Sequence, residues 1–301
     1  MKVVEMPRIE KNLRRIGSAF SDLFRIIVSC EDDNEITFNF HNATFFHPFF
    51  IAPLAIYCDF CGKNFTNANL NRHLRDYLDV ISFNEPKIIR SVENVDNLIA
   101  TYRMRTYTPV CKFPIGMPEP EKDQIVSRIQ DLVEIQSQVK GRAKDPLTYM
   151  FSELIANIGE HSCSEYGYIY SQYLPREGCV NLCIADNGIN ILGSYLKTGK
   201  YTDKIQDNPA KALQLAIDGY STKDLPNTEN RGYGISSSIK MLVEGMHGSF
   251  FILSGNAFYR HDGDGKIIVR LPDRIAWNGT IILLKIPTTL PVDFDYYRYI
   301  E

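Results

Sequence analysis

The sequence has no uninterrupted apolar stretch long enough to cross a bilayer. Its longest apolar run extends from Phe45 to Phe60 and is broken by a histidine, two prolines and an aspartate. A membrane-spanning helix needs about 20 consecutive apolar residues, so we expect no membrane association. The N-terminal segment also lacks an apolar stretch followed by a small-residue cleavage site, and we therefore expect no secretory signal.

The chain also lacks an excess of basic residues, since 33 Lys and Arg stand against 36 Asp and Glu. This balance does not indicate a nucleic-acid surface, and we expect no nucleic-acid partner. The cysteines number 7, an odd count, and they lie in otherwise apolar segments. That pattern favours buried thiols in a reducing, cytoplasmic setting over a framework of disulfides.

Proline clusters between Pro109 and Pro120 in an otherwise evenly mixed sequence. Because proline fixes φ and removes an amide donor, the cluster predicts an extended linker. We place a boundary there and predict two domains, residues 1–112 and residues 113–301. Strand-like and helix-like segments alternate in the first domain, which predicts a small α/β fold.

The second domain is predicted to contain two long helices followed by several strands. The helices are expected over residues 121–141 and 145–162, where apolar residues recur with helical spacing. Strand-like runs follow at residues 166–173, 179–186, 249–255, 266–271 and 280–287. Two helices and a set of strands predict an α/β two-layer sandwich.

The helix expected over residues 145–162 carries Glu153, Asn157 and His161 at intervals of four. This spacing places a carboxylate, an amide and an imidazole in one line at the border of the apolar face. Polar groups there favour a polar ligand that docks against the helix. The alternative is the solvated flank of an ordinary amphipathic helix.

Three further motifs contain acidic, glycine and hydroxyl residues. In CIADNGINI, Asp186 ends an apolar strand and could accept from the amine of a purine, while Gly188 permits close approach to the backbone. In RGYGISSS, Gly232 and Gly234 precede a helix whose N-terminal amides could cradle phosphates. Thr280 opens a strand in NGTIILLKIP. Each motif alone is equally typical of a turn.

In this order the four motifs resemble those of the GHKL ATPases (gyrase, heat-shock chaperones, histidine kinases and MutL) over roughly residues 120–290. The resemblance implies a Bergerat-type α/β sandwich with a mixed sheet, which binds ATP with Mg²⁺. The segment GYSTK, residues 219–223, looks like the lid segment of several branches. One departure is Asn190, which stands where the first glycine motif usually has its second glycine.

The resemblance also implies roles for individual residues. Asn157 matches the Mg²⁺ ligand, Glu153 the general base and Asp186 the residue that reads adenine. The other matched positions are the glycine beside the base (Gly188), the lid glycines that face the phosphates (Gly232 and Gly234), the threonine that supports the adenine site (Thr280), and two residues expected near the phosphates (His161 and Lys223).

The N-terminal region resembles a STAS-like domain over about residues 30–110, on the segment EITFNFHNATFFHPFFIAPLAIYCDF. Phosphorylation-switched STAS domains carry a serine in the turn before the helix, but His47 occupies that turn here. An alternative is a zinc finger on Cys58, Cys61 and His73. Its second histidine is replaced by Tyr77, and structural zinc normally needs four ligands, so we expect no zinc.

We therefore expect a Mg²⁺-dependent ATP-binding protein, either a slow ATPase or an ATP-driven conformational switch, whose N-terminal domain regulates it through a protein partner or a homodimer. Two alternatives remain open. One is a serine/threonine kinase of the anti-sigma type that acts on a separate STAS-like partner. The other is a nucleotide-gated interaction module that does not hydrolyse ATP. The helix over residues 121–141 contains no histidine, which argues against an autophosphorylating histidine kinase.

Overall fold

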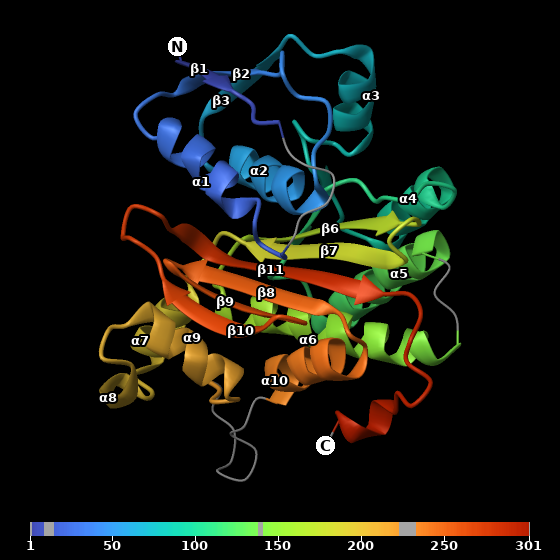
Figure 1. Ribbon diagram of the computed structural model, residues 1–301, viewed down its shortest axis with the longest axis vertical. Coiled ribbons are helices and arrows are strands. Elements are labelled where there is room, and N and C mark those ends of the chain that lie inside the picture. Colours follow the sequence, from blue (N-terminus) through green and yellow to red (C-terminus); the bar gives the residue numbers. More distant parts are fainter. Residues whose placement is uncertain (1, 9–14, 138–140, 223–232, 301) are drawn as a thin grey trace.

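The computed structural model describes residues 2–8, 15–137, 141–222 and 233–300. Within these residues the chain forms three layers, with an eight-stranded sheet in the middle. In Figure 1 the N-terminal segments lie above this sheet and most of the later helices lie below it. The fold is therefore α/β, with both faces of the large sheet covered.

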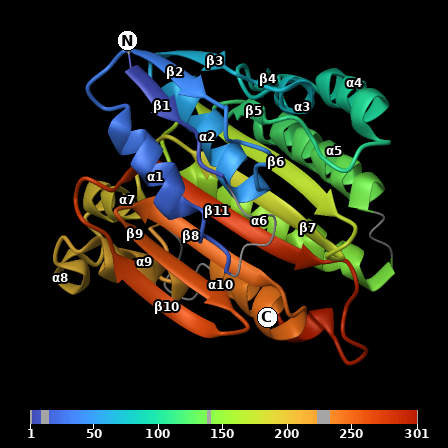
Figure 2. The same cartoon turned by 45° about the horizontal axis from the view of Figure 1, so that its top comes forward.

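The large sheet is mixed, and Figure 2 shows its strands running across the molecule. Adjacent strands are antiparallel except for the parallel pair β4 and β5. In spatial order the strands are β10 (Gly265–Arg270), β9 (Ala257–Asp262), β8 (Ser249–Gly255), β11 (Trp277–Pro287), β7 (Cys179–Asp186), β6 (Tyr166–Leu174), β5 (Cys111–Pro114) and β4 (Lys87–Ile88).

The N-terminal layer comprises a small parallel sheet and three helices. The sheet has the order β1 (Lys2–Glu5), β2 (Glu35–Asn39) and β3 (Asn64–Ala68). The helices are α1 (Phe20–Ser29), α2 (Pro48–Phe60) and α3 (Arg72–Val80).

The opposite face of the large sheet is covered by a layer of helices. These are α4 (Val92–Tyr102), α5 (Glu119–Ser137), α6 (Lys144–His161), α7 (Ile191–Thr198), α8 (Thr202–Ile205), α9 (Pro209–Ile217) and α10 (Tyr233–Ile239), which continues as a π-helical turn over Lys240–Gly245. Short 3₁₀ turns lie at Gly141–Ala143 and Tyr296–Arg298.

Helix α2 is enclosed between the two sheets. Its residues from Pro48 to Tyr57 are all buried. A helix that is apolar on every side is stable only when it is buried on every side, which explains why this segment has no polar face. Strand β7 is likewise buried along its whole length, because it has a packed layer on each face.

Most of the expected helices and strands are confirmed. The helices expected over residues 121–141 and 145–162 are α5 and α6, and all five expected strands of the second domain are present. Strand β9 was not expected. The expectation of a linker near residue 112 is wrong, because this residue lies in β5, which is hydrogen-bonded to β6.

The segment considered as a zinc finger instead forms the end of α2, strand β3 and the start of α3. Among the described residues, no group of three or more His, Cys, Asp or Glu side chains lies close enough together to hold a metal ion. In the same part of the chain, no helix is both long and apolar enough to cross a membrane.

A nearly buried ion pair joins the N-terminal layer to the large sheet. Lys112 Nζ on β5 lies 2.7 and 2.8 Å from the two carboxylate oxygens of Asp59 on α2. The hydroxyl of Tyr168 on β6 donates to the same carboxylate at 2.8 Å. The two charged side chains are only 15% and 14% exposed. Each charge is thus removed from water and depends on its partners.

We expect replacement of Lys112 by methionine to lower the free energy of unfolding by about 3 kcal/mol, since it leaves a buried carboxylate without its cation. The matched control is Arg72→Met, which breaks the exposed pair that Arg72 makes with Asp76 at 3.8 Å. This control should change stability by less than about 0.5 kcal/mol. Urea unfolding measures both, and equal midpoints for Lys112→Met and the control would contradict the expectation.

Candidate functional site

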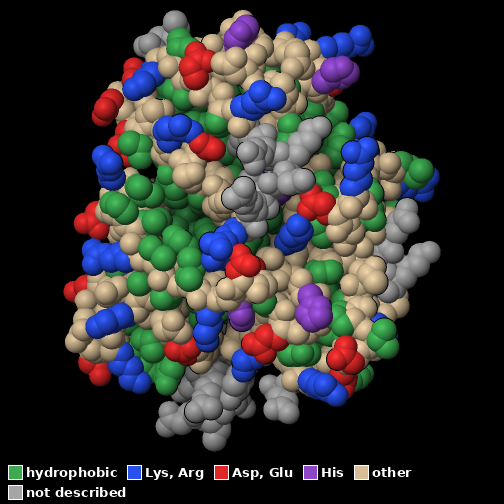
Figure 3. All heavy atoms as spheres, viewed as in Figure 1, with side chains coloured by type: hydrophobic (Ala, Val, Ile, Leu, Met, Phe, Trp, Pro, Cys, Tyr) green, Lys and Arg blue, Asp and Glu red, His purple; other side chains and the backbone are tan. Residues whose placement is uncertain are grey.

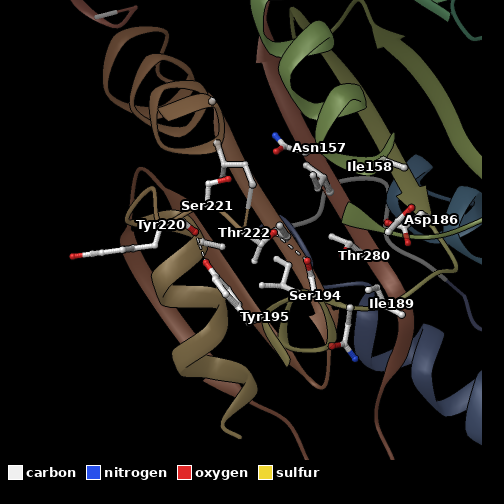
Figure 4. Close-up of a pocket in the computed structure, with 18 of the residues that line it drawn as sticks. Asn157, Ile158, Asp186, Ile189, Ser194, Tyr195, Tyr220, Ser221, Thr222 and Thr280 are labelled. Carbon is white, nitrogen blue, oxygen red and sulfur yellow. Dashed lines mark hydrogen bonds between the residues drawn. The ribbon is translucent and has the colours of Figure 1, made fainter. Parts of the chain in front are cut away.

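A cavity lies between the large sheet and the helical layer, with walls from α6, α7, the end of α9 and α10. Figure 4 shows its labelled polar side chains on several walls: Asn157 on α6, Asp186 and Thr280 on the sheet, and Ser194 and Thr222 on the opposite side. Six isoleucines supply much of its apolar surface, namely Ile158, Ile189, Ile191, Ile235, Ile252 and Ile282. The cavity therefore has apolar walls with polar groups at defined points, as small-molecule sites do.

Helix α6 contributes Glu153 and Asn157, which both line the cavity. The side-chain amide of Asn157 donates from Nδ2 to the carbonyl of Glu153 at 2.7 Å. This hydrogen bond leaves the amide oxygen, Oδ1, as the group that can accept or ligate. A Cβ atom at Gly234 would overlap the carboxylate of Glu153, so α10 approaches α6 closely here and a larger residue would displace that carboxylate.

Asp186 ends strand β7 and is only 1% exposed. Its Oδ1 accepts a hydrogen bond from the backbone amide of Gly188 at 2.9 Å. Burial raises the pKa of this carboxyl to about 7, and hydrogen bonds from the amides of Gly188 and Thr280 offset only part of that rise. Because its hydrogen bonds do not fully compensate for the loss of water, the buried carboxylate of Asp186 favours a ligand that brings another hydrogen-bond donor.

Two glycines bring the chain close to Asp186. Gly279 has a φ of +91° and lies so near that a Cβ would overlap the carbonyl and carboxylate oxygens of Asp186. The register of β11 against β8 shifts at this point, between Trp277 and Thr280. At Gly188 a Cβ would overlap the carbonyl oxygen of Ser162. Only glycine at both positions allows this packing around Asp186.

Asn190 shows how the chain accommodates the missing second glycine. Its φ is −75° and its ψ is 172°, so the backbone is extended and does not require glycine. The Asn190 side chain caps α7 by accepting from the amide of Gly193 at 2.8 Å. An asparagine is therefore favourable at this position, as an N-cap rather than as a left-handed residue.

Sequence reasoning missed several residues in the cavity wall and directly behind it. Ser254 on β8 accepts from the amide of Ile191 at 2.9 Å, and its hydroxyl lies 2.9 Å from that of Thr280. The hydroxyls of Ser194 and Thr222 are 3.2 Å apart. An isolated serine in the sequence does not indicate a binding site, so Ser194 and Ser254 could not be predicted. Thr222 belongs to the segment GYSTK, which was expected to be part of a lid.

The structure brings together Glu153, Asn157, Asp186, Gly234 and Thr280 around one cavity. Gly188 lies beside it, hydrogen-bonded to Asp186. The remaining predicted site residues are not described: Lys223, Gly232 and the side chain of His161 lie outside the described part of the chain.

The cavity is narrow, with a volume of about 120 Å³. Pockets for drug-sized ligands usually have about 300–1,000 Å³. A ligand as large as a nucleotide therefore requires its walls to separate, and the close approach of Gly234 to Glu153 is one contact that would have to loosen.

Comparisons with known proteins give no match to a family model, to a curated protein or to a solved structure. The chemistry of this site is therefore argued from its own residues.

Burial of Asp186 predicts a specific pH dependence of stability. A pKa near 7 in the folded chain, against an ordinary value of 3.8, means that the folded state holds this proton more tightly. Stability should therefore fall as pH rises from about 4 to 7, by about 1.4 kcal/mol for each unit of pKa difference. Asp186→Asn removes this ionisation, so from pH 5 to pH 8 the variant should lose about 3 kcal/mol less stability than the wild type.

Urea unfolding without nucleotide at the two pH values measures this difference. For each protein, the free energy of unfolding at one pH is subtracted from that at the other. The contacts of the new amide shift stability equally at both pH values and therefore cancel. An identical pH dependence in the two proteins would show that Asp186 does not titrate in this range.

Proposed function

We propose that this protein binds ATP together with Mg²⁺ in the cavity between α6 and the sheet, as a GHKL-type ATPase. The observation that carries the proposal is the buried carboxylate of Asp186, whose pKa is raised to about 7 by burial, at the edge of a cavity walled by isoleucines. An adenine ring has an amine that donates to such a group and two flat faces that suit aliphatic side chains. Adenine can therefore be buried against the isoleucines favourably, because the hydrogen bond from its amine offsets the desolvation of the Asp186 carboxylate.

Thr280 and Gly279 belong to the adenine end of this proposed site. The amide of Thr280 helps to hold the carboxylate of Asp186, and Gly279 lets the strand approach it. Ser254 keeps the hydroxyl of Thr280 and the start of α7 in place by contacting both. These residues fix the orientation of Asp186 before the base binds.

Asn157 and Glu153 belong to the phosphate end. The Asn157 amide donates to a backbone carbonyl through Nδ2, so its oxygen can face a cation. Mg²⁺ prefers oxygen ligands and often takes only one or two from protein, with the rest from phosphates and water. Bound there, the ion would neutralise phosphate charge. Asn157 would supply one such oxygen, and the phosphates and water would supply the rest.

Glu153 is the residue we assign as general base, since its carboxylate lines the cavity one helical turn before Asn157. In this role it would orient a water molecule and accept its proton. The alternatives of a serine/threonine kinase and of a module that does not hydrolyse ATP use the same binding residues. They differ in what happens at Glu153, and the second experiment below separates them.

The N-terminal layer is proposed to regulate the site. Trp277 donates through Nε1 to the backbone carbonyl of Asp186 at 2.9 Å. Its ring packs edge-on against Phe60 of α2, with the ring centroids 5.2 Å apart. Any partner that shifts α2 would therefore act on the strand end that carries Asp186.

We expect the wild-type protein to bind ATP more tightly with Mg²⁺ than without it. Asn157→Ala should remove most of the Mg²⁺ dependence, because it removes the proposed ligand of the ion. Asp186→Ala should weaken ATP binding by about tenfold or more, with or without the ion, because it removes the acceptor for the adenine amine. Calorimetry measures all three proteins. The control is Asn97→Ala, an exposed asparagine on α4, which should bind as the wild type does. Failure of the folded wild type to bind ATP would refute the proposal.

Replacement of Glu153 by glutamine tests what the bound ATP does. We expect phosphate release to fall by about 10²–10⁴-fold while ATP binding is retained, because general-base assistance typically contributes that factor. Phosphate release and calorimetry are measured on the same samples. Equal, negligible release from both proteins would instead support the module that does not hydrolyse ATP. Release that needs an added STAS-like protein, with phosphate transferred to it, would support the kinase.

A further inference from the structure

A second cavity lies on the other face of the large sheet, between α1 and strands β8 and β9. Its volume is about 750 Å³, against about 120 Å³ for the first cavity. This volume lies within the range of small-molecule pockets. Figure 3 shows hydrophobic side chains gathered on this side of the molecule, below the position of α1 in Figure 1.

The floor of the second cavity is apolar and largely aromatic. Helix α1 contributes Phe20, Phe24 and Val28, which are spaced by four residues and therefore share one face. The sheet contributes Phe251 from β8 and Phe258 from β9, whose rings stack with centroids 5.4 Å apart. A floor of this kind favours a long apolar ligand.

Four arginines line the same cavity, and no aspartate or glutamate among the described residues does. Three of them already have carboxylate partners outside the lining. Arg15 lies 2.9 Å from Asp264 on the turn between β9 and β10, and Arg25 pairs with Asp22 on the preceding turn of α1. Both of these arginines are largely exposed to solvent.

Arg260 and Arg274 still offer donors to a ligand: the ion pair of Arg260 leaves its Nε without a hydrogen bond, and the guanidinium of Arg274 is exposed. Arg260 lies on β9 and its side chain is 13% exposed. Its Nε is 3.2 Å from a carboxylate oxygen of Asp262, yet this buried nitrogen makes no hydrogen bond. Arg274 is exposed, and no ion pair of its guanidinium is recorded in the described part of the chain. A buried donor without an acceptor is costly, so a ligand that supplies an acceptor is favoured.

We propose that the second cavity binds a long-chain carboxylate, with its alkyl chain on the aromatic floor and its carboxylate at Arg260 and Arg274. A carboxylate matches the planar fork of a guanidinium, which can donate two parallel hydrogen bonds to it. The alkyl chain matches a floor that has aromatic and aliphatic side chains. The proposal does not depend on ATP binding, since none of the residues that line this cavity lines the first one.

The test is calorimetric titration of the full chain with octanoate, decanoate and dodecanoate, all below their micelle concentrations. Affinity should rise by about fourfold for each added methylene, as expected for burial of an alkyl chain. Dodecanol, which has the same tail without the charge, should bind at least tenfold more weakly than dodecanoate. Absence of binding by dodecanoate, or equal binding of dodecanol and dodecanoate, would overturn the proposal.

Variants locate the two ends of the ligand. Arg274→Ala should weaken dodecanoate at least tenfold and leave dodecanol unchanged. The matched control is Arg270→Ala, because Arg270 is also exposed but pairs with Asp273 at 3.2 Å and does not line the cavity. Val28→Glu places a charge on the floor and should weaken both ligands, with thermal unfolding used to establish that the variant folds. Unchanged affinity of Arg274→Ala for dodecanoate would refute the assignment of the head group.

Discussion

The central strands of the large sheet have to pack against a different layer on each face, and the position of every other part depends on this constraint. In β11, Ile281 and Leu283 belong to the core shared with the N-terminal layer, whereas Ile282 and Leu284 belong to the core shared with the helices. Alternation along a strand makes this possible without any change of backbone. Burial on both faces also explains why the strands are rich in apolar residues at every position. The cost is that neither layer can shift far without disturbing a strand that the other layer uses.

This arrangement places the candidate nucleotide site within reach of the N-terminal layer. The carbonyl of Asp186 accepts from Trp277, and Trp277 packs against Phe60 of α2. The ion pair of Lys112 and Asp59 fixes α2 to the other half of the same sheet. Helix α2 is therefore attached near both the middle and the edge of the sheet. Movement of α2 requires either that these contacts break or that the strands move with it, which gives the proposed regulation a physical route.

Much of the helical layer could be predicted because its signals are local. The spacing of Glu153 and Asn157 follows from helical periodicity, and Asp186 and Gly188 follow from an apolar strand that ends in turn residues. The rest depends on contacts between distant segments. Strand β5 was mistaken for a linker because its prolines are a local signal, whereas pairing with β6 is not. Strand β9, whose sequence is AFYRHD, has too few apolar residues to be recognised without β8 beside it. Ser254 contacts Thr280 of the site only because β8 and β11 are neighbours.

Strand β8 separates the two cavities, and its side chains line both of them in turn. Ile252 faces the first cavity, while Phe251 and Leu253 face the second. Because alternate residues point to opposite faces, adding or removing one residue before this strand would exchange the two sets. Ile252 would then be on the aromatic floor, and Phe251 and Leu253 would enter the first cavity. The strand can therefore diverge in evolution by substitution at single positions, but a change in its length would alter both cavities in one step.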